Sequence, residues 1–340
     1  MRHPQHPPPM TQRLLVICLF ALAAVLALAS LAIGPAQLGA GAIWRGLVDG
    51  DGFAGLILRD IRLPRTVLAL IAGGGLGLAG AALQGLLRNP LAEPAIFGAP
   101  QAAALGAVLV LFVAGGAPGS LAVGGAAVGG ALLALALLVA IAGRSESLTA
   151  FLLAGLAIGS LAGALTTLVL NLAPNPFALA EIVYWMMGSF ENAALPQVAI
   201  AGACILVGGA LLFAAGPALR ALALGEEVAE SLGTRLGAVR LAIVAGVGLI
   251  VGGTTAVAGA IGFVGLVAPH LVRRACGYDP ARLLLPAALA GACLLTAADI
   301  AVRLIPANTE LKVGVLTSLI GVPVFLWILI GGYRAREGAR

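Results

Sequence analysis

Uninterrupted apolar runs of about twenty residues recur along this chain and constrain its fold more than any other feature. Residues 14–34 and 148–172 are examples, and each is long enough for a helix to cross about 30 Å of hydrocarbon. The chain is 61% hydrophobic and 10% charged, with a mean hydropathy of +1.09, far outside the range of soluble globular domains. The sequence therefore predicts an integral membrane protein in a lipid bilayer.

Glycine content favours a bundle of helices over a β-barrel. The chain has 48 glycines, and small residues let membrane helices approach closely. A barrel would need strands of about ten residues with alternating polarity, whereas these runs are continuously apolar. The four cysteines have no metal-type spacing, so we expect apolar thiols and neither a metal site nor a cofactor.

We expect a disordered cytoplasmic lead (residues 1–13), a transmembrane domain (14–333) and a cytoplasmic tail (334–340). The run 14–34 exceeds the apolar core of a signal peptide, so it is expected to be the first span. Prolines 174 and 176 precede residues 177–190, which are too short to cross and predict a half-helix carrying Glu181, whose role stays open. The ten expected spans are 14–34, 66–87, 95–114, 121–142, 148–172, 195–215, two within 238–272 that fold back near Gly252, Gly253, Gly259 or Gly262, 283–302 and 313–332.

Basic residues indicate the orientation. An even number of spans puts both termini on one side, and that side then carries thirteen of the 19 arginines and lysines. Cytoplasmic loops are enriched in such residues, so both termini are expected in the cytoplasm. Nine-residue segments at 72–80 and 245–253 share the pattern A-G-x-G-L-x-x-x-G. They lie five spans apart, and an odd offset predicts an inverted repeat.

A charged stretch at residues 221–240, within a predicted coupling loop at 217–240, interrupts the second half of the chain. Val228 and Leu232 are four residues apart on one helical face, with glutamates on the remainder. Gly225 and Gly233 punctuate the pattern, because glycine readily ends a helix in the left-handed conformation. Two brief helices are therefore predicted; an ordinary cytoplasmic loop is the alternative interpretation.

The stretch L-x-L-G-E-E-x-A-x-S-L-G resembles the coupling loop of permeases in the iron chelate and vitamin B12 branch of ABC importers. The resemblance covers residues 12–333. Further blocks match the same family in order: R-L-P-R at 62–65, Q-G at 84–85, N-P-L-A-E-P at 89–94, W-M-M-G-S at 185–189, G-F-V-G-L-V-A-P-H at 262–270, and Glu310 followed by G-V-P-V-F-L-W at 321–327.

This resemblance implies a type II ABC importer permease fold with ten helices and an inverted repeat. The permease would pair with a second copy of itself, two cytoplasmic ATPase subunits and a periplasmic binding protein in the bacterial inner membrane; no nucleic acid partner is expected. The roles implied are ATPase coupling for Gly225, Glu226, Glu227, Ser231, Leu232, Gly233 and Arg235, binding-protein docking for Arg62, Arg65 and Arg303, and a cytoplasmic gate for Asn89, Leu91, Ser147 and Thr149.

The arginines allow a plainer interpretation, in which Arg303 forms an exposed pair with Asp299 and Arg62 with Asp60. The gate residues could likewise form a simple structural turn. His270 lies alone beside Arg273 and Arg274 and is expected to be structural.

Two other function classes fit the residues less well. An ion-coupled secondary transporter needs ionisable residues near the midplane, and Glu181 is the one acid that stays open. A membrane enzyme needs clustered histidines or acids, which the spans lack. The sequence also has no G-x-x-x-x-G-K-[ST] nucleotide motif, so the chain is expected not to hydrolyse ATP itself. The expected cargo is a ferric siderophore or haem-like iron chelate, with cobalamin as the alternative.

Overall fold

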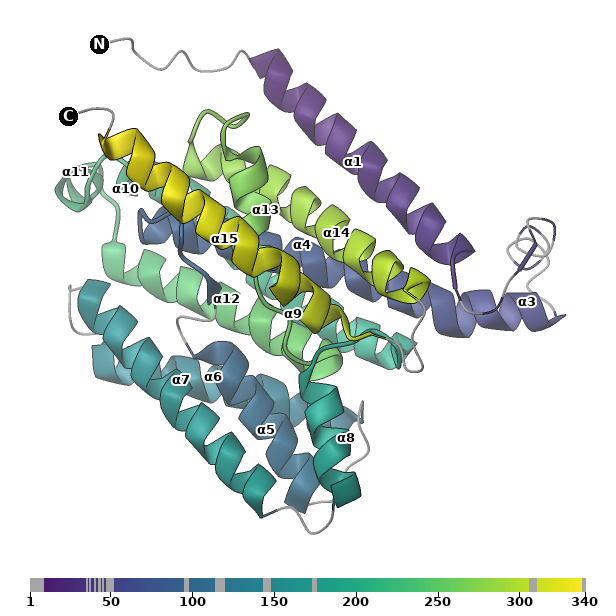
Figure 1. Cartoon of the computed structure of the whole chain (residues 1–340). Helices are drawn as coiled ribbons and strands as arrows, with labels where there is room; N and C mark the ends of the chain where they lie inside the picture. The colour runs from purple at the N-terminus through teal and green to yellow at the C-terminus, as the bar shows by residue number, and fades with distance from the viewer. Residues whose placement is uncertain are drawn as a thin grey trace.

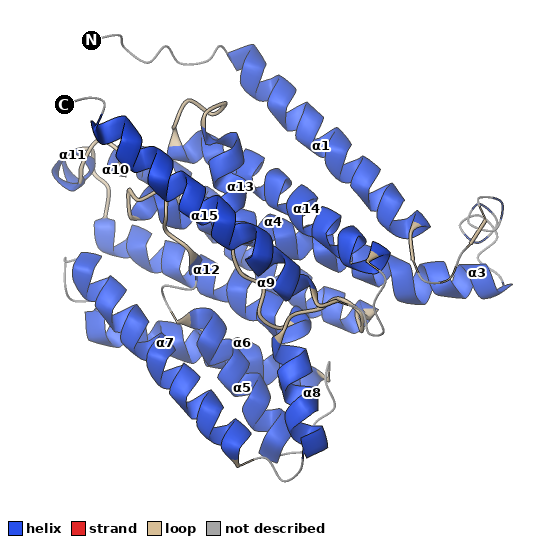
Figure 2. Cartoon of the chain, viewed as in Figure 1, coloured by secondary structure: helices blue, strands red, loops and turns tan. Residues whose placement is uncertain are grey.

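The computed structural model describes residues 9–34, 52–94, 98–113, 120–142, 148–172, 176–305 and 311–337, with a few single positions between 36 and 46. This part of the chain consists of helices and their connections, without a strand (Figure 2). An apolar chain in hydrocarbon forms helices because each backbone N–H and C=O must bond within its own segment. The all-helical prediction is confirmed.

The helices in chain order are α1 (Pro9–Ala32), α3 (Gly52–Leu56), the π-helix η1 (Ile57–Arg62), α4 (Leu63–Leu86), α5 (Ala99–Val113), α6 (Leu121–Ala142), α7 (Leu148–Asn171), α8 (Pro176–Met186), α9 (Leu195–Ala214), α10 (Gly216–Leu222), α11 (Glu226–Ser231), α12 (Leu236–Ala258), α13 (Val264–Arg273), α14 (Pro280–Leu304) and α15 (Val313–Glu337). Within the described residues, seven helices are long and apolar enough to span a membrane, and α5, α13 and α15 contribute shorter apolar segments. These ten segments agree with the expected count.

Helix α4 is the centre of the bundle, and most of its residues are buried. A side chain at Gly73 or Gly77 would overlap the backbone of α14 at Gly291 and Ala287, and one at Gly80 would overlap the carbonyl of Gly265 on α13. The backbone of α4 therefore touches those of α13 and α14 directly. In lipid the hydrophobic effect does not drive helices together, so dispersion between these closely packed backbones stabilises the bundle instead.

The long run at 238–272 folds back in the link between α12 and α13, which holds two of the expected glycines, Gly259 and Gly262, and not the other two. Helix α12 ends at Gly259, which takes a φ of 69°. Gly252 and Gly253 lie inside α12, where an added Cβ would come within 2.6 Å of Ala131 and 2.5 Å of Cys204. The expectation that these two glycines mark the turn is therefore wrong, because they are needed for packing against α6 and α9.

In the repeat, α4 of the first half corresponds to α12 of the second half, and α6 corresponds to α14. Each of these helices packs against a helix of the other half. Helix α4 of the first half packs on α14, and α12 of the second half packs on α6. The hairpin of α5 and α6 likewise corresponds to that of α13 and α14. This arrangement is consistent with the inverted repeat. In Figure 1, the start of α1 and the end of α15 lie at the same end of the bundle as α10 and α11, while α3 lies at the opposite end.

Candidate functional site

The two short helices that the charged stretch predicted are α10 and α11. Gly225 precedes α11 with a φ of 117°, and Gly233 follows it with a φ of 83°. The N–H of Thr234 donates to the carbonyl of Ala229 at 3.0 Å and that of Gly233 to Glu230 at 2.8 Å, the bonding pattern of a Schellman C-terminus. Both glycines hold conformations that L-residues rarely adopt, so they fix where α11 begins and ends.

The apolar side chains of this segment point outward. Leu224 is 67% exposed, Val228 42% and Leu232 65%, whereas Ala229 is buried against the bundle. Glu227, Ser231 and Arg235 are exposed beside them. We call Leu224, Val228 and Leu232 the outer edge of α11. It is a small apolar surface surrounded by charge, a composition suited to a protein partner.

Two ion pairs attach these short helices to the spanning ones. The Glu226 carboxylate binds the buried guanidinium of Arg240 on α12 at 3.0 Å. Arg220 on α10 binds Asp279 at 2.9 Å, and Asp279 also accepts the N–H groups of Ala281 and Arg282 as the N-cap of α14. These two ion pairs therefore tie α10 and α11 to α14 and α12. The paired residues are 14 and 59 positions apart, so no helical spacing in the sequence indicates that they meet.

Three arginines meet at the opposite end of the bundle. The carboxylate of Asp299 on α14 is fully buried and accepts from Arg65 Nε at 3.0 Å and Nη2 at 2.8 Å. Arg303 Nη2 lies 2.9 Å from the second oxygen of Asp299. The Asp299–Arg303 pair is thus real, but the expectation that it is exposed is wrong, because α1, α4 and α14 enclose it.

The expected pair of Arg62 with Asp60 does not form. Arg62 instead donates to the carbonyls of Leu31 at 2.7 Å and Ala32 at 2.9 Å, the last residues of α1. Arg303 donates to the carbonyls of Ser30 at 2.9 Å and Ile33 at 2.8 Å. Two guanidinium groups thus satisfy carbonyls that a helix C-terminus leaves without partners. All three arginines are buried in this arrangement.

The four candidate gate residues are only partly described. Asn89 is exposed in the turn after α4, and its side-chain oxygen accepts the N–H of Leu91 at 3.0 Å. This bond and Pro90 give the turn a fixed shape. Thr149 is exposed in the first turn of α7. Ser147 lies outside the described residues, so the structure does not test whether the two segments face each other.

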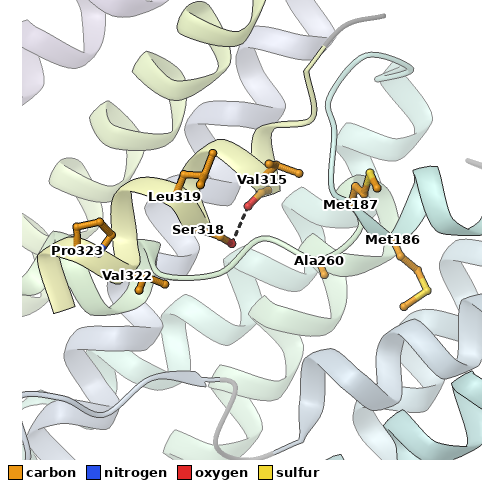
Figure 3. Close-up of a pocket in the computed structure, with 9 residues that line it drawn as sticks. Met186, Met187, Ala260, Val315, Ser318, Leu319, Val322 and Pro323 are labelled. Carbon is orange, nitrogen blue, oxygen red and sulfur yellow. Dashed lines mark hydrogen bonds between the residues drawn. The ribbon is translucent and has the colours of Figure 1, made fainter. Parts of the chain in front are cut away.

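An apolar cavity of about 690 Å³, largely open to the surroundings of the chain, lies between the end of α8, the link from α12 to α13, and α15. Figure 3 shows Met187 beside Val315 at one end and Pro323 at the other. Its lining is Met186, Met187, Ala260, Gly314, Val315, Ser318, Leu319, Val322 and Pro323, none of which is ionisable. Within the described residues no cluster of three histidines, cysteines or acids could hold a metal. The surface of this cavity is therefore apolar and uncharged.

Comparison with known proteins agrees with these features. The FecCD transport family model matches residues 22–331. The vitamin B12 import system permease BtuC of Salmonella paratyphi A is 39% identical over 280 residues, 82% of this chain and 85% of that protein. BtuC of Citrobacter koseri is 38% identical over 292 residues, 85% of this chain and 88% of that protein.

A solved structure extends the likeness to three dimensions. It is the inward-facing conformation of an ABC transporter assigned to the metal-chelate type, with a TM-score of 0.84 and 30% identity over 93% of this chain and 98% of that one. The family match, the relatives and this structure all describe permeases or transporters. The chain therefore belongs to the FecCD transport family and is a multi-pass membrane permease of a bacterial ABC importer.

Proposed function

We propose that this permease works as a homodimer that carries a bulky metal chelate inward, driven by two ATPase subunits in the cytoplasm and supplied by a periplasmic binding protein. The observation that carries the proposal is the outer edge of α11, held on two glycine hinges and tied to α12 and α14 through Arg240 and Asp279. A short helix with this apolar edge is suited to a groove on an ATPase.

The coupling residues are Gly225, Glu226, Glu227, Ser231, Leu232, Gly233 and Arg235. Replacing Gly225 and Gly233 together by valine is expected to misdirect α11, because both have φ values that valine avoids. Nothing lies within 4 Å of a Cβ at either site, so the effect arises from the backbone and not from a steric clash. Gly237→Val is a suitable control, since its Cβ is equally unobstructed and its φ is ordinary.

The experiment reconstitutes the permease with the ATPase that co-purifies with it and measures uptake together with ATP hydrolysis. The double valine variant is expected to hydrolyse ATP without substrate stimulation and to lose uptake. Normal uptake with normal stimulation in this variant would remove α11 from the coupling role.

Both termini are proposed to lie in the cytoplasm with α11. The start of α1 and the end of α15 lie at the same end of the bundle as α10 and α11 (Figure 1), and the basic residues of the loops are concentrated on that side. An impermeant maleimide applied to right-side-out vesicles is expected to miss a cysteine at Arg235 and to label one at Asp60. Labelling at Arg235 but not at Asp60 would show that the chain has the opposite orientation in the membrane.

Asn89, Leu91, Ser147 and Thr149 are proposed as the cytoplasmic gate. The rigid turn at Asn89 and the exposed start of α7 at Thr149 support this role. Cysteines at Asn89 and Thr149 are expected to form crosslinks between the two copies whose yield changes with bound nucleotide. Crosslinking that is equal in every nucleotide state would exclude these positions.

Arg62, Arg65 and Arg303 are proposed to dock the periplasmic binding protein, which must then compete with their contacts inside the permease. Their guanidinium groups are buried and engaged with Asp299 and the end of α1, so an acidic partner must compete with those contacts. Arg62→Gln is the clearest probe because the Arg62 guanidinium donates to backbone carbonyls, those of Leu31, Ala32 and Ala36. We expect weaker, less salt-dependent association with the binding protein, and undiminished association at low salt would contradict the role.

The cargo is proposed to be a metal chelate. The uncharged cavity supports a large ligand with apolar surface, for which the expected candidate is a ferric siderophore or haem-like iron chelate. Cobalamin is the second candidate, favoured by the two BtuC relatives. Uptake of radiolabelled cobalamin and of a ferric hydroxamate into the same proteoliposomes decides between them, and uptake of neither would refute the metal chelate class.

A further inference from the structure

Several family-like blocks of the sequence, far apart along the chain, converge on the turn between α4 and α5. Pro94 packs against Gly265 at the start of α13, where an added Cβ would lie 3.0 Å from Pro94 Cδ. Gln84, Glu93 and Phe263 make the polar and apolar contacts around it. None of these residues belongs to the coupling, docking or gate sets, so their concentration here requires a separate explanation.

Glu93 fixes the end of the turn to the start of α13. Its carboxylate oxygen Oε1 accepts the backbone N–H of Phe263 at 2.6 Å. Phe263 takes a left-handed φ of 66°, a conformation that a bulky residue adopts only when its surroundings enforce it. The same link, between α12 and α13, contributes Ala260 to the apolar cavity.

Phe263 also contacts the opposite wall of the cavity. A Cβ at Gly321 on α15 would overlap Cβ and Cγ of Phe263, so the ring lies directly against the α15 backbone. Val322 and Pro323, the next two residues of α15, line the cavity. Phe263 therefore stands between a cavity-lining helix and Glu93.

Gln84 fixes the other end of the turn to α13. Its buried amide donates to the carbonyl of Ala92 at 3.3 Å and, at longer range, to those of Gly265 and Leu266 at 3.4 and 3.5 Å. Its oxygen accepts from Arg273 in the last turn of α13. Gln84, at the end of α4, thus joins Ala92 in the turn to both ends of α13.

We propose that Glu93 and Gln84 are positioning residues that link the apolar cavity to the turn carrying Asn89 and Leu91. A shift of α15 moves Phe263, Phe263 moves Glu93, and the bonds of Gln84 make α13 and the turn move together as one unit. The inference rests on the proposed gate for its functional meaning. It differs from the gate proposal in naming the residues that make the turn respond to the cavity.

The test uses a single reporter cysteine, Leu91→Cys, in the full chain bound to its ATPase in nanodiscs, with the four native cysteines replaced by alanine. The rate of modification by a water-soluble maleimide reports the position of the turn. Gly321→Ala is the perturbation, because its methyl group displaces Phe263. Gly163→Ala on α7 is the matched control, since nothing lies within 4 Å of its Cβ.

Gly321→Ala is expected to change the labelling rate by about threefold or more, a size typical of residues coupled through direct contacts. Glu93→Gln should preserve this response because its amide oxygen still accepts from Phe263. Glu93→Ala should reduce it to that of the Gly163→Ala control. An equal response in Glu93→Ala, or none in the native Glu93 background, would overturn the proposal.

Two measurements keep the outcome decisive. If Gly321→Ala does not assemble, Phe263→Ala perturbs the same contact by removing the ring, and the same dependence on Glu93 is required. Labelling in ATP and in ADP tests the gate separately: a rate independent of nucleotide, with the Glu93-dependent response intact, would refute the gate and leave the linkage standing.

Discussion

Replacing Asp299 by asparagine should be among the most destabilising conservative changes in this permease. The carboxylate is fully buried and pairs with two guanidinium groups, those of Arg65 and Arg303, at 2.8 and 2.9 Å. Removing one partner of a buried ion pair costs about 3–5 kcal/mol, because the remaining charge stays desolvated. Asparagine is nearly isosteric, so cavity formation adds little to this figure. An exposed pair, as the sequence suggested, would cost about 0–1 kcal/mol.

The assay is reversible unfolding of the purified permease in mixed micelles of increasing SDS fraction, followed by circular dichroism. Asp60→Asn on η1 is the matched control, because its carboxylate is exposed, and it should stay within about 0.5 kcal/mol of the native protein. Replacing Arg65, Asp299 and Arg303 together by Met, Leu and Met should recover part of the loss, since no unpaired charge remains in the cluster. A loss below about 1 kcal/mol for Asp299→Asn would refute the reasoning.

Three further predictions follow from local contacts. Gly80→Ala should lower the free energy of unfolding by about 1–3 kcal/mol or prevent folding, because the methyl group overlaps Gly265 of α13. Gly163→Ala should leave the stability unchanged in the same SDS titration. Equal stability of the two variants would contradict the close approach of α4 and α13. Burial raises the pKa of Cys276 to about 11 and keeps this thiol protonated at pH 7. At pH 7, N-ethylmaleimide should therefore modify Cys276 only after unfolding, and rapid modification of the folded protein, measured by mass spectrometry, would count against this. Arg240→Gln should speed cleavage by a glutamate-specific protease at Glu226–Glu230, because α11 loses its ion pair with α12. Arg235→Gln, at an exposed position, should not change the cleavage rate. Identical cleavage rates in the two variants would show that Arg240 does not hold α11 in place.

The sequence by itself determined the spans and the short helices. Hydrocarbon thickness imposes a length of about twenty residues on each apolar run, so the run boundaries predict helices such as α6 almost residue for residue. Gly225 and Gly233 likewise delimit α11, because a left-handed φ is a local property of the backbone. The family resemblance rested on the same local patterns, and the family match confirms it.

Only the tertiary structure decided which distant residues meet. Arg65 and Asp299 are 234 positions apart. The sequence suggested near neighbours as partners for Arg62 and Arg303, which is correct for Arg303 with Asp299 but not for Arg62, whose partners are carbonyls at the end of α1. The turn after α12 lies at Gly259 and not at Gly252 or Gly253, because those two glycines fit against α6 and α9. The cavity beside α15 and the contact of Glu93 with Phe263 also depend on packing between segments. Such contacts have no period or spacing along the chain, since their geometry is set by how closely whole helices approach one another.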